Sequence, residues 1–240
     1  MFVIYISGID GCGKTTQAKL LNEFLINENY DSQYQWLRWS PSIIRIISTA
    51  KSLLSFAISD KTKNKKTKTV THSDETLKQS ENLHFSKWTL LKKKLFSMRL
   101  FSFLWDSYSL RDYYRSYQQS SNNWTSEIII LDRYLMDFFV DQSINYNESV
   151  NNYKSRLNEN ILNRFKKPDL FFLIDISPET GWERKRDGTS MKHLNILANV
   201  YNEIKTEDGI FTIQGQQSKE AIHEEIKRIV VKELRKRNEF

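Results

Sequence analysis

Short apolar runs alternate along this chain with longer stretches of helical or irregular pattern. Five of these runs are rich in β-branched and aromatic residues, and they predict strands at 2–6, 34–39, 127–131, 169–175 and 209–214. The third and fourth runs are almost continuously apolar, which is typical of central strands in a parallel sheet. Strands that alternate with helices predict an α/β fold, here a five-stranded parallel sheet with helices on both faces.

Two helices are predicted beside these strands. Apolar residues at 20, 21, 24 and 25 have helical spacing and predict a helix directly after the first strand. Segment 217–237 predicts a second helix with one apolar face that packs on the sheet. This face consists of Ile222, Ile226, Ile229, Val230 and Leu234.

Residues 51–105 interrupt the alternation as an enlarged basic and aromatic insertion. From Ser59 to Asn82 the chain is polar and rich in lysine, threonine and serine, which predicts a mobile surface loop. Residues 88–105 combine leucines and aromatic residues with a basic patch, a mixture found both in core helices and in helices that lie on anionic membranes. We favour the core helix over peripheral membrane contact, because the apolar residues between 100 and 105 surround too much of the helix circumference.

Composition narrows the class of protein. The 240 residues, 39% of them hydrophobic, suffice for one sizeable core and predict a single domain over 1–240. No apolar run reaches the roughly 18 residues that a membrane span needs, and the single cysteine, Cys12, suits a reducing compartment, so we expect a cytoplasmic protein. The net charge of +7 accompanies no recognisable nucleic-acid module. We interpret it as solvated surface charge and expect no nucleic-acid partner.

The strongest chemical signal follows the first predicted strand. Residues 8–15 read Gly-Ile-Asp-Gly-Cys-Gly-Lys-Thr, a complete G-x-x-x-x-G-K-T phosphate loop between a strand and a helix. Its glycines let backbone N–H groups turn toward phosphates, Lys14 can reach the β and γ oxygens, and the Thr15 hydroxyl can bind Mg²⁺. The loop therefore predicts binding of ATP, with the Cys12 side chain incidental. The expected ATP-binding residues are Gly8, Asp10, Gly11, Cys12, Gly13, Lys14, Thr15 and Thr16.

A second signal, Asp132-Arg133-Tyr134, follows the third predicted strand. A carboxylate at the carboxyl end of a strand beside the phosphate-loop strand is placed to hold Mg²⁺ and its waters. The neighbouring arginine can bind a phosphate through two parallel hydrogen bonds. We therefore expect Thr15 and Asp132 as metal ligands, with Mg²⁺ as the cofactor that accompanies ATP.

Together these motifs resemble those of the thymidylate kinase family, a branch of the nucleoside monophosphate kinases. Residues 8–17 are similar to its phosphate loop, including the acidic residue and the trailing Thr-Gln, and residues 130–134 to its D-R-Y/H motif. Residues 167–179 are similar to its P-D-L-x-x-x-L-D-x-x-P-E segment, and Arg184-Lys185-Arg186 follows where the family begins its basic lid. The resemblance implies a P-loop kinase fold, a lid and a homodimer. In this chain the lid is placed at 184–200 and is short.

The resemblance also implies a reaction, in which the γ-phosphoryl group of ATP passes to a nucleoside monophosphate. The acceptor that the resemblance favours is dTMP, which would become dTDP. Lys14 and Thr15 would hold the donor phosphates and Mg²⁺. Arg184 and Arg186 would close over the donor and stabilise the charge of the transition state, as phosphoryl transfer requires. The implied catalytic residues are Lys14, Arg133, Arg184 and Arg186.

On the acceptor side, the resemblance implies that Asp10 positions the sugar hydroxyl of the acceptor. It also implies that Arg38 and Arg133 bind the acceptor phosphate. Three departures leave the acceptor open. First, residues 37–41 match the family's T-R-E-P-G only loosely, and the stretch from there to Trp105 is longer than usual. Second, Ser107 stands where the family has an arginine that reads the base. Third, the lid from Arg186 to Tyr201 is short. Other implied acceptor-side residues on the same segment are Phe103, which could stack on the base, and Arg111, which could replace the missing arginine.

Two other functions stay open for this sequence. One is a kinase of the same fold that acts on a different small acceptor, such as another nucleotide, a nucleoside or a sugar. The other is a nucleotide-binding regulatory or membrane-associated module that docks through the basic residues 61–105. The combination of Lys14, Asp132 and Arg133 with lid arginines favours catalysis.

Overall fold

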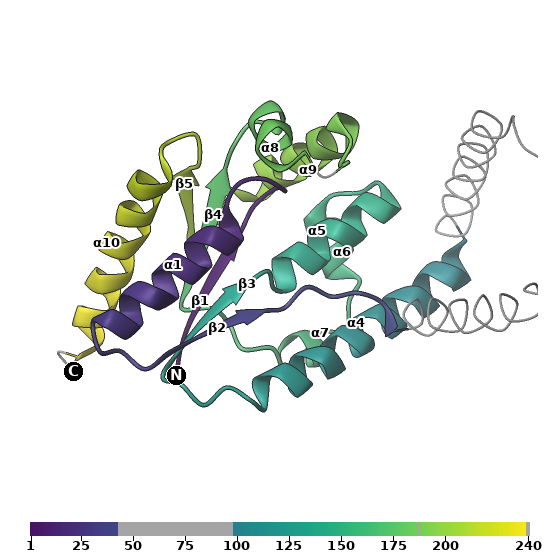
Figure 1. Ribbon diagram of the computed structural model, residues 1–240. Helices are drawn as coiled ribbons and strands as arrows, with labels where there is room; N and C mark the ends of the chain where they lie inside the picture. Colours follow the sequence, from purple (N-terminus) through teal and green to yellow (C-terminus); the bar gives the residue numbers. More distant parts are fainter. Residues whose placement is uncertain (43–97, 187, 239–240) are drawn as a thin grey trace, which may run out of the picture. The chain divides into compact units, whose positions relative to one another are not determined.

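The computed structural model of the protein describes residues 1–42, 98–186 and 188–238 (Figure 1). Contacts along the chain divide it into two compact units, Met1–Trp39 with Tyr114–Phe240 in the first and Ser40–Tyr113 in the second. Most of the predicted insertion 51–105, including the whole of the predicted surface loop, lies outside the described residues. All the strands described below belong to the first unit.

A parallel sheet of five strands, in the order β2-β3-β1-β4-β5, forms the centre of the first unit (Figure 1). The strands are β1 (Phe2–Ser7), β2 (Ser32–Trp36), β3 (Ile128–Asp132), β4 (Leu170–Asp175) and β5 (Ile210–Gln214). Ile4 on β1 pairs with Ile130 on β3 and Leu170 on β4, so β1 is central, and both β1 and β3 are buried throughout. The predicted five-stranded parallel sheet is confirmed.

Strand β2 begins two residues before its predicted start and ends at Trp36 rather than at residue 39. Ser32 and Gln33 are polar, yet they pair in register with Ile128 and Ile129 of β3. An edge strand is half exposed and tolerates polar residues, so its apolar pattern is a poor guide to its ends. The register with β3 therefore sets the bounds of β2.

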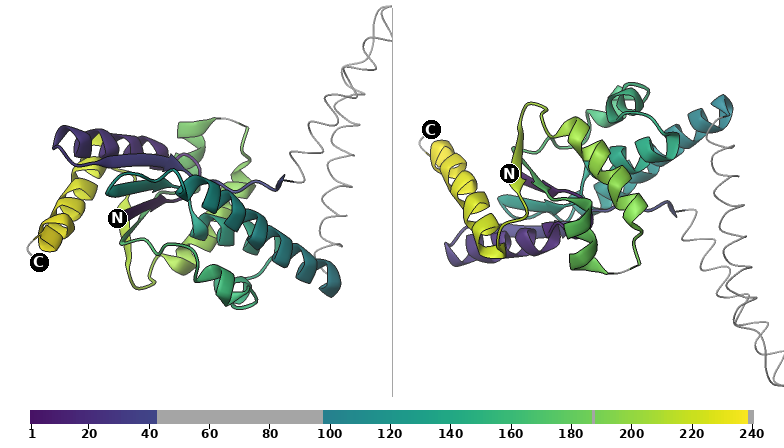
Figure 2. Two further views of the ribbon diagram at one scale, coloured as in Figure 1. Left: turned by 90° about the horizontal axis from the view of Figure 1, so that it is seen from below. Right: turned by 90° about the horizontal axis from the view of Figure 1, so that it is seen from above.

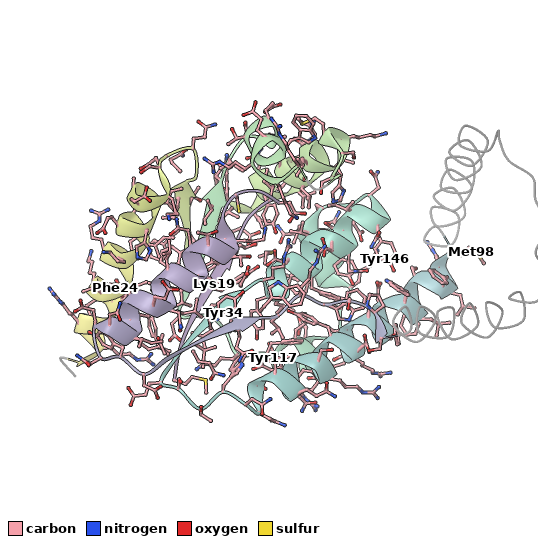
Figure 3. All side chains as sticks on the ribbon, in the orientation of Figure 1. Lys19, Phe24, Tyr34, Met98, Tyr117 and Tyr146 are labelled. Atoms are coloured by element: carbon pink, nitrogen blue, oxygen red, sulfur yellow. The ribbon has the colours of Figure 1, made fainter. Side chains whose placement is uncertain are left out.

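Helices cover both faces of the sheet, as predicted (Figure 2). Helices α1 (Lys14–Asn27) and α10 (Lys219–Asn238) lie together on one face, where Lys227 Nζ is 4.8 Å from the ring centroid of Phe24 (Figure 3). Helix α5 (Leu135–Tyr146) packs against α6 and α9 on the other face. The remaining helices are α4 (Arg99–Ser121), α6 (Val150–Ser155), α7 (Glu159–Leu162), α8 (Pro178–Lys185) and α9 (Met191–Ile204).

The amino and carboxyl ends of the parallel strands carry different polar groups. At the amino ends of the strands, Asp169 exchanges two hydrogen bonds with the backbone of Val3, each 2.8 Å long, and so joins β4 to β1. The aspartate of the P-D-L segment therefore has a structural role in this fold. The carboxyl end of β1 leads into the phosphate loop, and that of β3 leads into Asp132-Arg133. Both motifs therefore lie at the carboxyl ends of the strands.

In the second unit the structure describes residues 40–42 and the part of α4 up to Tyr113. The first turns of α4 expose large apolar side chains: Leu100 is 71% exposed, Phe103 68% and Leu104 57%. The prediction of a core helix over 88–105 is therefore wrong for the described residues 98–105, while 88–97 lie outside the described ranges. A wide apolar circumference predicts burial only if other parts of the protein cover it. Among the described helices, none is long and apolar enough to cross a bilayer.

Candidate active site

The phosphate loop owes its shape to glycines and to close backbone packing. Gly8, Gly11 and Gly13 have φ angles of 145°, 85° and 95°, a region that other residues rarely adopt. A Cβ atom on Gly11 would also lie 2.2 Å from the carbonyl oxygen of Gly181 in α8. In return, a Cβ atom on Gly181 would lie 2.7 Å from the carbonyl oxygen of Asp10. The loop and α8 therefore pack backbone against backbone, with no room for a side chain at position 11.

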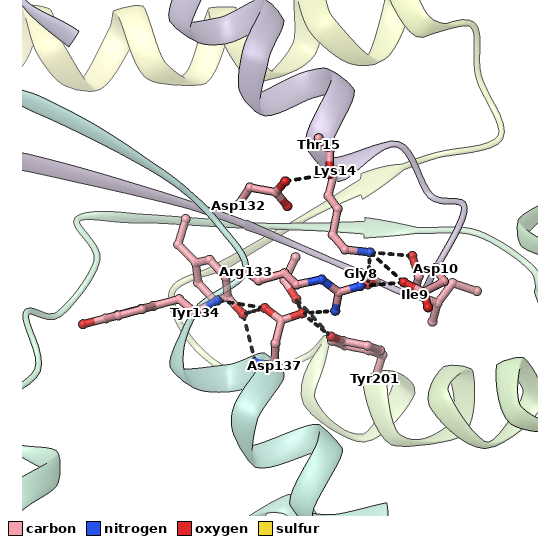
Figure 4. Close-up of polar contacts among 12 residues, drawn as sticks. Gly8, Ile9, Asp10, Lys14, Thr15, Asp132, Arg133, Tyr134, Asp137 and Tyr201 are labelled. Carbon is pink, nitrogen blue, oxygen red and sulfur yellow. Dashed lines mark hydrogen bonds and ion pairs between the residues drawn. The ribbon is translucent and has the colours of Figure 1, made fainter. Parts of the chain in front are cut away.

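Lys14, the first residue of α1, points back into the loop (Figure 4). Its Nζ donates to the carbonyl oxygens of Gly8 at 3.0 Å and Ile9 at 3.1 Å and lies 3.5 Å from Asp10 Oδ1. The side chain is buried, so its charge acts in a medium where electrostatic interactions are stronger than in water. This ammonium group can neutralise phosphate oxygens that enter the loop.

Asp10 is surrounded by cations that come from four different parts of the chain: α1, α8 and the segments that follow β2 and β3. Arg133 Nη2 lies 2.5 Å from Asp10 Oδ1, and Lys185 Nζ lies 3.5 Å from Oδ2. Burial raises the pKa of Asp10, but the charges of Lys14, Arg133, Lys185 and Arg38 outweigh burial and lower the pKa from 3.8 to about 2. The predicted residues Lys14 and Arg133 therefore both contact Asp10, and Arg38 acts on the same carboxylate.

Asp132 and Thr15, the two residues expected to bind the metal, are hydrogen-bonded to each other. The buried Asp132 Oδ2 accepts hydrogen bonds from Thr15 Oγ1 at 2.6 Å and from the Tyr34 hydroxyl at 3.0 Å. Burial and the charge of Asp132 raise the pKa of Tyr34, which keeps this hydroxyl a donor. Asp132 Oδ1 is buried and has no hydrogen-bond partner among the described residues. A free carboxylate oxygen beside a hydroxyl group fits Mg²⁺, which prefers oxygen ligands.

Asp137, on the first turn of α5, was not predicted as a site residue. It lies four residues after Arg133, and its Oδ1 is 3.4 Å from Arg133 Nη1. The same carboxylate accepts hydrogen bonds from Tyr5, Ser7 and Tyr201, which come from β1 and α9 (Figure 4). The spacing of four after the arginine was the one signal in the sequence, since residues at i and i+4 meet on a helix.

The three consecutive basic residues at the predicted start of the lid point to different partners. Arg184 Nη1 donates to the carbonyl oxygen of Gly215, which follows β5, at 2.8 Å. Lys185, which was not in the predicted set, is the residue that reaches Asp10. Arg186 caps α8 with a left-handed backbone, at φ 30°. Successive helical residues point about 100° apart, so these three side chains cannot face one phosphate together without a change in the segment.

The acceptor residues predicted on α4 belong to the second unit. Phe103, Ser107 and Arg111 are four residues apart and so share one face of the helix. Phe103 and Arg111 are exposed, and Ser107 is partly buried. Of the remaining predicted ATP-binding residues, Cys12 is buried inside the loop and Thr16 is exposed on the first turn of α1.

Comparisons with known proteins bear on the family and the fold of this chain. The sequence profile of the thymidylate kinase family matches residues 90–226, more than half of the chain. The phosphate loop precedes the matched range, so it is independent of that match. The structure of deoxyadenosine kinase from M. mycoides with bound dATP superimposes with a TM-score of 0.53 at 17% identity, covering 96% of this chain and 99% of that one. This likeness confirms the P-loop kinase fold. A search of curated protein sequences gave no match.

Proposed function

This chain belongs to the thymidylate kinase family, and from that premise we propose that it transfers the γ-phosphoryl group of ATP to a nucleoside monophosphate, with dTMP as the preferred acceptor. The observation that carries the proposal is the group of cations around Asp10. Four basic side chains act on one carboxylate there, beside a loop built to hold phosphates. Such a site suits two anionic reactants that must be brought together.

The chemistry of the acceptor separates the proposal from its main rival. A nucleoside acceptor attacks through a hydroxyl group and must lose a proton, for which a base with a pKa near neutrality is most effective. Asp10, with a pKa of about 2, is a poor base. A phosphate acceptor is already an anion and needs cations instead, and Arg133 and Arg38 can supply them.

Each side of the reaction then has its residues. Lys14 would exchange the carbonyl oxygens of Gly8 and Ile9 for donor phosphate oxygens. Mg²⁺, held by Thr15 and Asp132, would neutralise charge on the donor phosphates. Arg133 would exchange Asp10 for the acceptor phosphate, which leaves the Asp10 carboxylate available for the sugar hydroxyl of the acceptor.

For the lid, we propose that Lys185 and Arg186 supply charge to the transferred phosphoryl group. Lys185 is already directed at Asp10. Arg184 can join them only if it leaves the carbonyl oxygen of Gly215. Arginines or lysines supplied by a closing segment stabilise the transition state of phosphoryl transfer and exclude water from it.

The test is an ADP-release assay with Mg-ATP and a panel of nucleoside monophosphates and matched nucleosides. We expect dTMP to give the highest kcat/KM and the Lys14→Ala variant to abolish that rate. A higher kcat/KM for thymidine or deoxyadenosine than for every monophosphate would overturn the proposal in favour of a nucleoside kinase. ATP binding without turnover of any acceptor would favour the regulatory module.

Asp141 provides a sharper discrimination between the two kinase classes. Burial and the nearby Asp137 raise the pKa of this carboxyl, although Arg38 and Arg133 partly oppose the shift. It is therefore the carboxyl group near the site that would best serve as a base for a hydroxyl acceptor. Under our proposal Asp141→Asn keeps kcat for dTMP within about fivefold, whereas a general base contributes roughly 10²–10⁴-fold.

The preference for one nucleobase of the acceptor is tested by a substitution on α4, in the second unit. We propose that Phe103 and Arg111 contact the base and that Arg111 replaces the arginine missing at Ser107. Arg111→Ala should then reduce the preference for dTMP over other monophosphates without changing the KM for ATP. The homodimer remains a prediction, which sedimentation velocity of the full chain would check.

A further inference from the structure

We propose that Asp137 and Tyr201 are positioning residues for Arg133: a buried network of oxygens fixes the guanidinium from behind, so that its other side is free to exchange Asp10 for an acceptor anion. The identity of that anion, a phosphate, rests on the proposed function. The geometry of the network does not depend on the proposed function.

Arg133 needs such support because its own conformation is unfavourable. Its φ angle is 70°, a conformation that costs an L-residue free energy and persists only where the surroundings enforce it. Its side chain is 11% exposed and lies between two carboxylates, with Nη2 on Asp10 Oδ1 and Nη1 on Asp137 Oδ1. Burial alone would lower the pKa of Arg133, but Asp137 and Asp10 raise it, so the guanidinium stays charged.

Asp137 is held so completely that it cannot rotate. Its side chain is 4% exposed, and both oxygens are used. Oδ2 accepts from the Tyr5 hydroxyl at 2.5 Å and from the backbone N–H of Tyr134 at 3.0 Å. Oδ1 accepts from Ser7 Oγ at 3.1 Å and from the Tyr201 hydroxyl at 3.0 Å, in addition to Arg133. Since a carboxylate has about four acceptor sites, this one is saturated.

Tyr201 brings a distant part of the chain to this centre. It lies near the end of α9, the helix that follows the predicted lid, and its hydroxyl also lies 3.1 Å from Ser7 Oγ. Burial and the charge of Asp137 raise the pKa of Tyr201 well above its ordinary value, so the hydroxyl remains a donor at neutral pH. The position of α9 is thereby transmitted through one hydrogen bond to Asp137 and from there to Arg133.

The two partners of Arg133 consequently have different roles. Asp10 also contacts Lys14 and Lys185, so its charge stays neutralised when a phosphate replaces it on Arg133. Among the described residues, Arg133 is the one cation in contact with Asp137. Separating this pair would leave a buried charge without its counterion, which is costly. Asp137 therefore retains the guanidinium while Asp10 releases it.

The first test compares Tyr201→Phe and Asp137→Asn with a matched control, Tyr117→Phe. Tyr117 is also a buried tyrosine, labelled in Figure 3, but its hydroxyl accepts a hydrogen bond from the Lys166 backbone. We expect Tyr201→Phe to raise the KM for the acceptor about five- to tenfold, as loss of one hydrogen bond permits, with the KM for ATP and kcat within about twofold. Asp137→Asn should raise the acceptor KM further, and Tyr117→Phe should leave it unchanged.

The second test needs no activity. The Nε–Hε resonance of Arg133, assigned by its absence in Arg133→Lys, should be sharp and slow to exchange in the wild-type protein and in Tyr117→Phe. It should broaden or exchange faster in Asp137→Asn and Tyr201→Phe, without any ligand. An unchanged resonance in Asp137→Asn, or an unchanged acceptor KM in an active Tyr201→Phe enzyme, would overturn the inference. A wild-type protein that phosphorylates no acceptor would refute the proposed function, and the resonance would still decide the role of Asp137.

Discussion

The phosphate loop and the Arg133 network, which consists of Arg133, Asp137, Tyr5, Ser7 and Tyr201, lie side by side but are built in opposite ways. The loop is one continuous segment, 8–15, and its glycines fix the backbone that we propose binds phosphates. The network is made of side chains from separate elements, and its members Ser7 and Tyr201 are 194 residues apart in the sequence. A site for an anion can thus be made either from local backbone geometry or from a buried balance of charges.

The difference has an energetic consequence. The loop presents N–H groups and Lys14 to a ligand, and a change in its side chains alters binding more than folding. The network buries Asp137 and two tyrosines, so each of its members is needed to satisfy another. Substitutions in the network should therefore cost stability as well as activity, whereas those in the loop should cost mainly activity.

The largest effect is expected for Arg133→Met, which leaves Asp137 buried without its counterion. We expect a loss of about 3–5 kcal/mol in the free energy of unfolding, the usual cost of breaking a buried pair, together with loss of transfer. Urea unfolding would measure it. Arg237→Met is the control, since Arg237 is half exposed and 3.5 Å from Asp169, and it should cost less than about 1 kcal/mol. Equal losses in the two variants would show that breaking the Arg133 network costs no more than breaking a surface ion pair.

Lys14→Met in the loop is expected to reduce activity much more than stability. Removing one preorganised charge from a transition state reduces kcat by roughly 10²–10³-fold, while the free energy of unfolding should change much less than in Arg133→Met. The assay is ADP release with the best acceptor, beside urea unfolding. Lys19→Met on the exposed side of the same helix serves as control (Figure 3). A Lys14→Met enzyme with more than a tenth of wild-type activity would contradict the assigned role.

Asp10 joins the two regions, and its pKa gives a pH-dependent test. Its folded-state pKa of about 2 is lower than the 3.8 of the unfolded chain, so it adds stability above pH 4 that is lost as the pH falls toward 2. Allowing for partial solvent screening, the contribution is about 1–2 kcal/mol. The stability difference between wild type and Asp10→Asn, measured by urea unfolding, should shrink between pH 4 and pH 2. A difference that stays constant over this range would show that the carboxylate charge is not stabilised.

The smallest effect is expected for Cys12→Ala. Burial raises the pKa of the Cys12 thiol more than the charge of Lys14 lowers it, so the thiol stays protonated at neutral pH. Because the loop binds through its backbone, kcat/KM should stay within about twofold of wild type. Disulfide reagents should label the native protein slowly. Rapid labelling with loss of activity would mean that the loop opens readily and is less fixed than the network.

Predictions from the sequence were most accurate where the determining interactions are local. The phosphate loop was identified because its glycines, lysine and threonine act within eight residues, and the central strands because burial on both faces makes them continuously apolar. The ends of β2 were misplaced because pairing with β3, not composition, fixes an edge strand. The start of α4 was expected in a core, yet Leu100 and Phe103 are exposed, since amphipathic pattern does not reveal what covers a helix.

The sequence by itself therefore determined the parallel sheet and the phosphate-loop motif, and it predicted that Asp132 and Arg133 belong to one site. Only the tertiary structure decided which cations act on Asp10, where Lys185 rather than Arg184 is in contact. It alone also decided that Asp137 binds Arg133 and accepts a hydrogen bond from Tyr201. The physical reason is that backbone geometry depends on neighbouring residues. A buried carboxylate, in contrast, must be satisfied by whatever donors the fold brings to it from elsewhere in the chain.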